Sequence, residues 1–109
     1  MHELGIAQEV VERACQHAGG APIKRIVLQI GKLSAVLPDA VRFCFDLCTE
    51  GTVAAGAVLE IREPAGLARC RACDGHVHLE RPYGECQCGS TDLDWIAGEE
   101  LKIESVELV

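Results

Sequence analysis

Residues 70–90, CRACDGHVHLERPYGECQCGS, decide how this chain folds. Cys70 and Cys73 form a C-x2-C pair, and Cys86 and Cys88 form a C-x-C pair. Twelve residues separate the two pairs. The surrounding segment, residues 65–93, has few large apolar side chains and therefore cannot build a core from them. Two thiolate pairs on successive hairpin tips can close a tetrahedral metal site. We expect residues 65–93 to form a small inserted module that folds around a metal ion.

Zinc suits four thiolates best, because it has no geometric preference from its d-electrons, and four protein ligands leave no position for water. The expected site is therefore structural, although an iron centre of the rubredoxin type would use the same ligands. A set of free or redox-active thiols is the less favoured alternative. The C-x-C pair is tighter than the usual C-x2-C knuckle, so either both cysteines bind or one yields to His76 or His78. We favour exposed strand positions for these two histidines.

The remaining cysteines and the composition favour a reducing compartment. The chain has 109 residues and seven cysteines, an odd number, and its N-terminus lacks the basic and apolar regions of a signal peptide. No apolar run is long enough to cross a bilayer, so we expect a soluble cytoplasmic protein. The net charge of -7 argues against nucleic acid or an anionic membrane as the main partner.

Outside the module, apolar periodicity predicts five elements. Apolar residues recur at three- and four-residue steps in the first segment, and proline and aspartate open the second helix. Three further segments alternate as strands do, the last with a shift of phase near Ser105. The predicted helices are 3–18 and 38–50, and the predicted strands are 24–33, 58–63 and 100–109.

These elements predict an α/β (α+β) fold in which two helices pack on a three-stranded sheet. Residues 1–64 and 94–109 form the body, and residues 65–93 form the inserted four-cysteine, zinc-ribbon-like module. The core is expected to consist of Val, Ile, Leu and Ala, since only four residues are aromatic. Cys44 and Cys48, one turn apart on the second helix, and Cys15 on the first, are expected to pack in this core.

The sequence contains no recognisable catalytic set. No Ser/His/Asp group, phosphate-binding glycine loop or isolated pair of acids stands out, so we expect no enzymatic activity. Zinc ribbons often bind nucleic acid, but residues 65–93 carry three arginines against four acids, and Tyr83 is their only aromatic residue. A nucleic-acid interface is therefore disfavoured.

The chain begins Met-His-Glu, which suits a nickel chelate. The free amine of Met1, the amide of His2 and its imidazole can form fused rings around one ion, and the amide of Glu3 can complete a planar set of four nitrogens. Ni(II) and Cu(II) favour such square-planar nitrogen geometry, whereas zinc does not. A histidine at position 2 is usually just an exposed side chain, so the tripeptide alone is weak evidence.

Three stretches together resemble the HypA/HybF family of hydrogenase-maturation nickel chaperones. They are MHELGIAQEVVE at the start, IGKLSAVLPDAVRFCFD at residues 30–46, and the four-cysteine insert ending in CGS. The resemblance spans essentially the whole chain. It implies that residues 1–64 and 94–109 form a nickel-binding domain, with nickel held by the terminal amine, His2 and the backbone of residues 2 and 3. Glu3 belongs to the same motif.

The resemblance also implies cofactors and partners. Zinc would be structural and held by Cys70, Cys73, Cys86 and Cys88, and nickel would be transferred cargo. Members work with a maturation GTPase of the HypB type, deliver nickel to the large subunit of [NiFe]-hydrogenase and in some organisms serve urease accessory proteins. The family's second knuckle is normally C-P-x-C-G, whereas this chain has Glu85-Cys86-Gln87-Cys88-Gly89. The competing interpretations are a zinc-ribbon module for protein or nucleic acid without a nickel role, and a redox protein.

Overall fold

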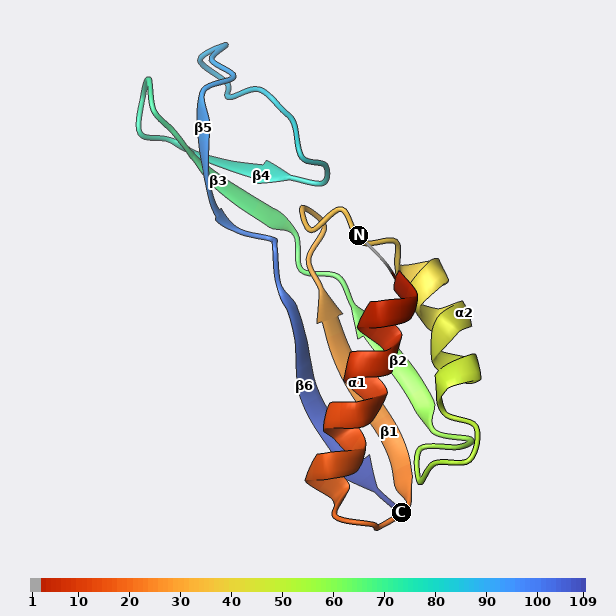
Figure 1. The fold of residues 1–109 in the computed structure, drawn as a ribbon. Coiled ribbons are helices and arrows are strands. Elements are labelled where there is room, and N and C mark those ends of the chain that lie inside the picture. The colour runs from red at the N-terminus through yellow and green to blue at the C-terminus, as the bar shows by residue number, and fades with distance from the viewer. Residues whose placement is uncertain (1–2) are drawn as a thin grey trace. The chain divides into compact units, whose positions relative to one another are not determined.

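The structure, a computed structural model, describes residues 3–109. Its element order is α1 (Glu3–Ala18), β1 (Ile23–Ile30), α2 (Pro38–Cys48), β2 (Val58–Arg62), β3 (Gly66–Cys70), β4 (His76–Leu79), β5 (Leu93–Ala97) and β6 (Leu101–Leu108) (Figure 1). The predicted mixed fold of two helices with sheet is confirmed, and the strands form two three-stranded sheets rather than one. Neither described helix has the length and apolar content to cross a bilayer.

The chain divides into two compact units. The first, called the helical unit here, consists of the segment through Gln29 together with Val36–Arg62 and Lys102–Val109. The second, called the cysteine unit, consists of Ile30–Ala35 and Glu63–Leu101. The cysteine unit thus extends beyond the predicted insert of residues 65–93.

Helix α1 packs through a stripe of small and branched aliphatic side chains. The buried positions repeat every three or four residues, which places them on one side of the helix; they are Ile6, Ala7, Val10, Val11, Ala14 and Ala18. The helix ends where the Gly19 N–H donates to the carbonyls of Cys15 and Gln16. Both ends agree with the prediction.

Helix α2 begins at Pro38, which suits the first helical position because it has no N–H to leave unpaired. It ends at Cys48, where the N–H of Thr49 donates to the carbonyl of Phe45, two residues before the predicted end. Val41 and Phe45 are its buried residues. They pack the helix beside α1, and both helices lie on one face of the sheet (Figure 1).

The sheet of the helical unit has the order β2-β1-β6. Strands β1 and β2 are parallel, with Arg25 opposite Val58 and Gln29 opposite Arg62, and α2 lies in the crossover that parallel pairing requires. Strand β6 runs opposite to β1 (Figure 1). Strand β1 supplies the buried centre of this unit's core with Ile26 and Leu28.

The alternation of β6 breaks as the sequence indicated. Its half-buried residues are Ile103 and Val106, three positions apart rather than two or four. Glu104 and Glu107, also three apart, form ion pairs with Arg62 and Arg25. These pairs are solvent-exposed and contribute little to stability.

The cysteine unit contains an antiparallel sheet of order β4-β3-β5. Its buried apolar cluster is Leu33, Ala68 and Leu79, with Val77 and Leu93 packed against it. Leu33 comes from the segment after β1. The predicted strand to residue 33 is therefore too long: β1 ends at Ile30 and a turn follows, closed by a bond from the Ser34 N–H to the Gly31 carbonyl.

Gly31 marks a close approach of two backbone segments. Its N–H donates to the Glu100 carbonyl at 2.7 Å, and the Leu33 N–H donates to the Gly98 carbonyl at 2.7 Å. A Cβ at position 31 would lie 2.0 Å from the Gly98 oxygen. Only glycine fits between these segments, and this contact holds Leu33 in the core of the cysteine unit.

Candidate metal centre

The first cysteine pair lies on a tight turn at the end of β3. The Asp74 N–H donates to the Cys70 carbonyl, and the Cys70 N–H donates to the Gly75 carbonyl, both at 2.8 Å. Asp74 adopts a positive φ of 62°, a conformation that aspartate tolerates better than most residues. This turn brings the side chain of Cys73 back toward that of Cys70.

The second pair lies on an equivalent turn between β4 and β5. The Gly89 N–H donates to the Cys86 carbonyl at 2.8 Å, and the Cys86 N–H donates to the Ser90 carbonyl at 2.9 Å. Gly89 has a φ of 90°, which a residue with a side chain adopts only under strain. The glycine after Cys88 therefore lets the short C-x-C spacing form a turn.

The two turns bring all four thiols together. Their Sγ atoms lie within 4.8 Å of one another. The Cys70 and Cys88 sulfurs are 3.6 Å apart, as are those of Cys73 and Cys86. A zinc ion with Zn–S bonds of about 2.3 Å would set the edge of its tetrahedron at roughly 3.8 Å. The group is thus compact enough for one ion bound by all four sulfurs.

Electrostatics in the cluster favour a bound cation. The N–H of Cys73, with that of Ala72, lowers the pKa of the Cys70 thiol to about 6. At Cys73 the N–H of Gly75 lowers the pKa, but the sulfurs of Cys86, Cys88 and Cys70 outweigh it and raise the value to about 12. The Cys70 thiolate therefore forms readily, and the ionisation of Cys73 is disfavoured by the neighbouring sulfurs. A divalent ion removes this repulsion, since coordination deprotonates thiols outright.

Both histidines of the insert lie outside the cluster. His76 and His78 are exposed on β4, as expected, and Cys86 is 7% exposed and belongs to the group of four sulfurs. The shortened C-x-C knuckle therefore does not move Cys86 away from the other thiols.

Ion pairs beside the cluster connect the segments that carry the cysteines, and the sequence did not predict them. Arg71, between the first two cysteines, forms ion pairs with Asp92 and Asp94 at the start of β5. This contact lowers the pKa of the Asp94 carboxyl through the bond from Arg71. The sequence does place a basic residue within the first cysteine pair and acidic residues after the second, and this pattern could have indicated the ion pairs.

The predicted nickel residues are described only in part. Met1 and His2 lie outside the described residues. Glu3 is the first residue of α1, and its carboxylate accepts a hydrogen bond from the N–H of Leu37 at 3.3 Å. Leu37 is the residue before α2, so the start of α1 is tied to the start of α2.

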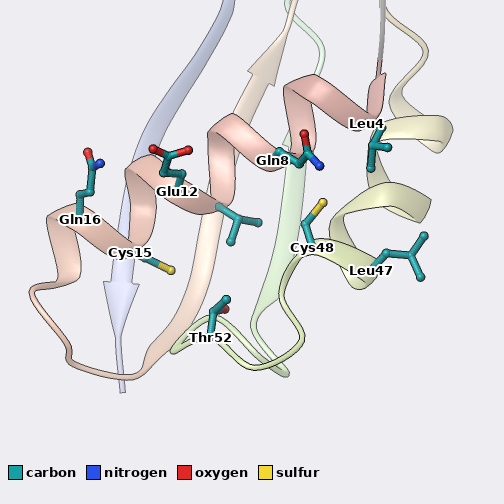
Figure 2. A pocket seen from close by; sticks show the side chains of 9 residues that line it. Leu4, Gln8, Glu12, Cys15, Gln16, Leu47, Cys48 and Thr52 are labelled. Atoms are coloured by element: carbon teal, nitrogen blue, oxygen red, sulfur yellow. The ribbon is translucent and has the colours of Figure 1, made fainter.

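The other three cysteines are half-buried. The sequence had instead predicted that they would be packed in the core. Cys15 of α1 and Cys48 of α2 line a groove of about 710 Å³ between the helices (Figure 2). Burial and the neighbouring Cys44 raise the pKa of the Cys48 thiol. The exposed side chains of Leu4 and Leu47 also line this groove.

Comparison with known proteins places this geometry in a family. The profile described as HypA, hydrogenase/urease nickel incorporation, metallochaperone, matches residues 1–108. The hydrogenase maturation factor HypA of Nostoc punctiforme is 57% identical over 108 residues, which cover 99% of this chain and 96% of that protein. The same factor from Geotalea uraniireducens is 43% identical over 109 residues, covering 99% of both.

Solved structures give the same result for the fold. The solution structure of the Ni metallochaperone HypA from Helicobacter pylori has a TM-score of 0.67 at 24% identity and covers 100% of this chain and 98% of its own. Another solution structure of HypA protein has a TM-score of 0.68 at 26% identity, with coverages of 100% and 97%. This chain therefore belongs to the HypA family of nickel-incorporation metallochaperones.

Proposed function

We propose that this protein binds Ni(II) at its N-terminus and carries it as cargo to a nickel enzyme. The ligands are the amine of Met1, the imidazole of His2 and the backbone nitrogens of His2 and Glu3. The observation that carries this proposal is the match of the HypA profile to residues 1–108, a range that includes this terminus.

The chemistry of these donors fits a carrier. Four nitrogens in a plane suit Ni(II), and binding releases the protons of the amine and amides, so affinity rises with pH. Because α1 begins at Glu3, the donors precede the regular hydrogen bonding of the helix. A site built mostly from terminal backbone can rearrange when the ion is handed over.

We further propose that zinc occupies the cluster of Cys70, Cys73, Cys86 and Cys88 in a structural role. The short sulfur separations and the opposition between thiolates support one divalent ion with four sulfur ligands. No ligand position remains for water, so zinc there supplies folding stability and no catalysis.

The recipient we propose is the large subunit of [NiFe]-hydrogenase, reached in the cytoplasm with a maturation GTPase of the HypB type. The curated relatives are named hydrogenase maturation factors, which favours hydrogenase, and the family description includes urease, which extends the proposal to urease accessory proteins. The protein acts as a carrier rather than an enzyme.

Nickel titration of three forms tests the N-terminal site. The forms are the native chain, His2→Ala, and a chain whose N-terminal amine is acetylated. We expect the native form to bind one diamagnetic, square-planar Ni(II), and the two altered forms to lose that signal. Equal binding of this species by all three forms would disprove the N-terminal site.

A further inference from the structure

The outer face of β4 presents two imidazoles side by side. Strand β4 reads His-Val-His-Leu, and its inward residues are Val77 and Leu79, which pack in the core of the cysteine unit. His76 and His78 are both exposed. Since side chains of a strand alternate between faces, the two histidines lie on the same outward face.

The spacing of this pair suits chelation of one ion. Residues two apart on a strand are separated by roughly 6.7 Å along its axis. Two imidazoles can lean together from this distance until both ring nitrogens reach an ion at about 2.0–2.1 Å. The register with β3 is regular from Gly66–Leu79 to Arg69–His76, so the strand holds both side chains on a fixed backbone.

The neighbours of the pair limit how tightly it can bind. Arg69 lies opposite His76, and Leu67 lies opposite His78. The cation of Arg69 is offset by Asp94, whose carboxylate lies 3.9 Å away. Glu80, the next outward position, is held by the ammonium of Lys32. Two imidazoles and water are therefore the donor set, which favours a weak site with fast exchange.

We propose that His76 and His78 form a second nickel site, exchangeable and separate from both the N-terminal chelate and the four-cysteine cluster. Imidazole is a good ligand for Ni(II), and water in the remaining positions makes the ion six-coordinate and paramagnetic. The proposal stands on the geometry of β4 and holds whether or not the N-terminal site exists. A site in the cysteine unit gives the protein a second place to receive or release its cargo.

The experiment uses the full-length, zinc-loaded chain with its N-terminal amine acetylated, titrated with Ni(II) alone. Calorimetry is expected to show one weak site, and NMR is expected to show paramagnetic broadening centred on residues 76–78. His76→Ala and His78→Ala should each weaken binding by roughly tenfold or more, because each removes the chelate. His17→Ala, at an exposed histidine near the end of α1, should change nothing.

Three outcomes overturn the proposal. One is the absence of Ni(II) binding in this form. Another is unchanged affinity in both single variants, which would mean that the imidazoles act separately or not at all. The last is Ni(II)–thiolate absorption together with zinc loss, which would place the ion on the cysteines. Zinc content and the amide spectrum of each variant confirm that it is folded. The N-terminal chelate is tested separately with the unacetylated chain.

Discussion

The two units of this chain reach a stable fold by different means. The helical unit buries aliphatic side chains from both helices and the sheet, and Ile26, Leu28, Val41 and Phe45 are at most 2% exposed. The cysteine unit buries a cluster of only three apolar residues, and two of its other buried side chains are Cys70 and Cys86. One unit is held by burial of apolar surface, and the other needs a cross-link.

This difference separates two tasks within one small protein. The stability of the helical unit depends mainly on the packing of apolar side chains. With the proposed zinc bound, the stability of the cysteine unit depends on its thiolates, so we expect it to respond to metal, acid and oxidation.

The largest effect is expected from removing the metal. Cys70→Ser, or zinc removal by a chelator, should unfold the cysteine unit, since structural zinc contributes on the order of 10 kcal/mol to such folds. Hydrogen exchange should show loss of protection in β3, β4 and β5. The amides of α1, α2 and β1 should stay protected.

Cys15→Ser is the matched control, because Cys15 lies in the helical unit and outside the cluster. It should bind a full equivalent of zinc and keep both units folded. Protection of β3 in the zinc-free chain equal to that in the zinc-loaded chain would show that the three-residue core suffices without a metal.

The next largest effect is expected from opening the helical core. Phe45→Ala removes a ring that is 2% exposed and should cost about 3–5 kcal/mol of unfolding free energy. Phe43, two residues earlier on the same helix, is 70% exposed, so Phe43→Ala should change stability by less than about 0.5 kcal/mol. Urea unfolding followed by circular dichroism measures both.

Measuring the zinc content of Phe45→Ala shows whether the cysteine unit is affected by the loss of packing in the helical unit. Phe45→Ala should still bind one zinc per chain, because the lost packing lies in the other unit. If zinc were lost in parallel with helix, the two units would be one cooperative structure and the comparison between them would be wrong.

The sequence predicts the helical unit well because burial leaves a periodic pattern. The stripe of Ala7, Val11, Ala14 and Ala18, which are all buried, predicts α1, and Pro38 predicts the start of α2. The spacing of the four cysteines likewise predicts a cluster that the structure brings together. In both cases the spacing of one kind of residue indicates the structure directly: apolar residues indicate a buried helix face, and paired cysteines indicate a metal site.

The rest was hidden because its cause lies in distant contacts. The strands of the insert are four or five residues long and were not predicted, because this segment has few large apolar side chains to mark an alternation. Leu33 follows β1 closely in the sequence and falls within the predicted strand, but it packs with Ala68 and Leu79 instead. Nothing local reveals that Gly31 must admit the backbone of Gly98. The segment after β1 belongs to the cysteine unit because of this contact between residues far apart in the sequence.

A smaller effect is expected at the start of α1. Glu3→Ala removes the acceptor of the Leu37 N–H, which should cost about 1 kcal/mol or less of unfolding free energy in the helical unit. Glu3→Gln keeps an oxygen acceptor and should recover most of that loss. Both variants should retain N-terminal nickel binding, since the only donor proposed from Glu3 is its backbone nitrogen. Urea unfolding and nickel titration measure the two properties, and loss of nickel by Glu3→Gln would assign the carboxylate a direct role.

The smallest effect is expected from the ion pair between Lys32 and Glu80 in the cysteine unit. The bond to the Glu80 carboxylate raises the pKa of Lys32 above its ordinary value of 10.5. The folded state thus favours the ammonium, so the stabilisation is complete below pH 10.5 and disappears as the pH rises through the raised pKa.

Lys32→Met keeps the aliphatic stem and removes the charge, so the melting temperature of the zinc-loaded protein should fall slightly at pH 7–9. The difference from the native chain should vanish at higher pH. Lys102→Met is the matched control, because Lys102 is exposed in β6 and forms no ion pair among residues 3–109. A shift at Lys32 equal to that at Lys102 would mean that the pair contributes nothing and that the cysteine unit relies on its metal and its small core alone.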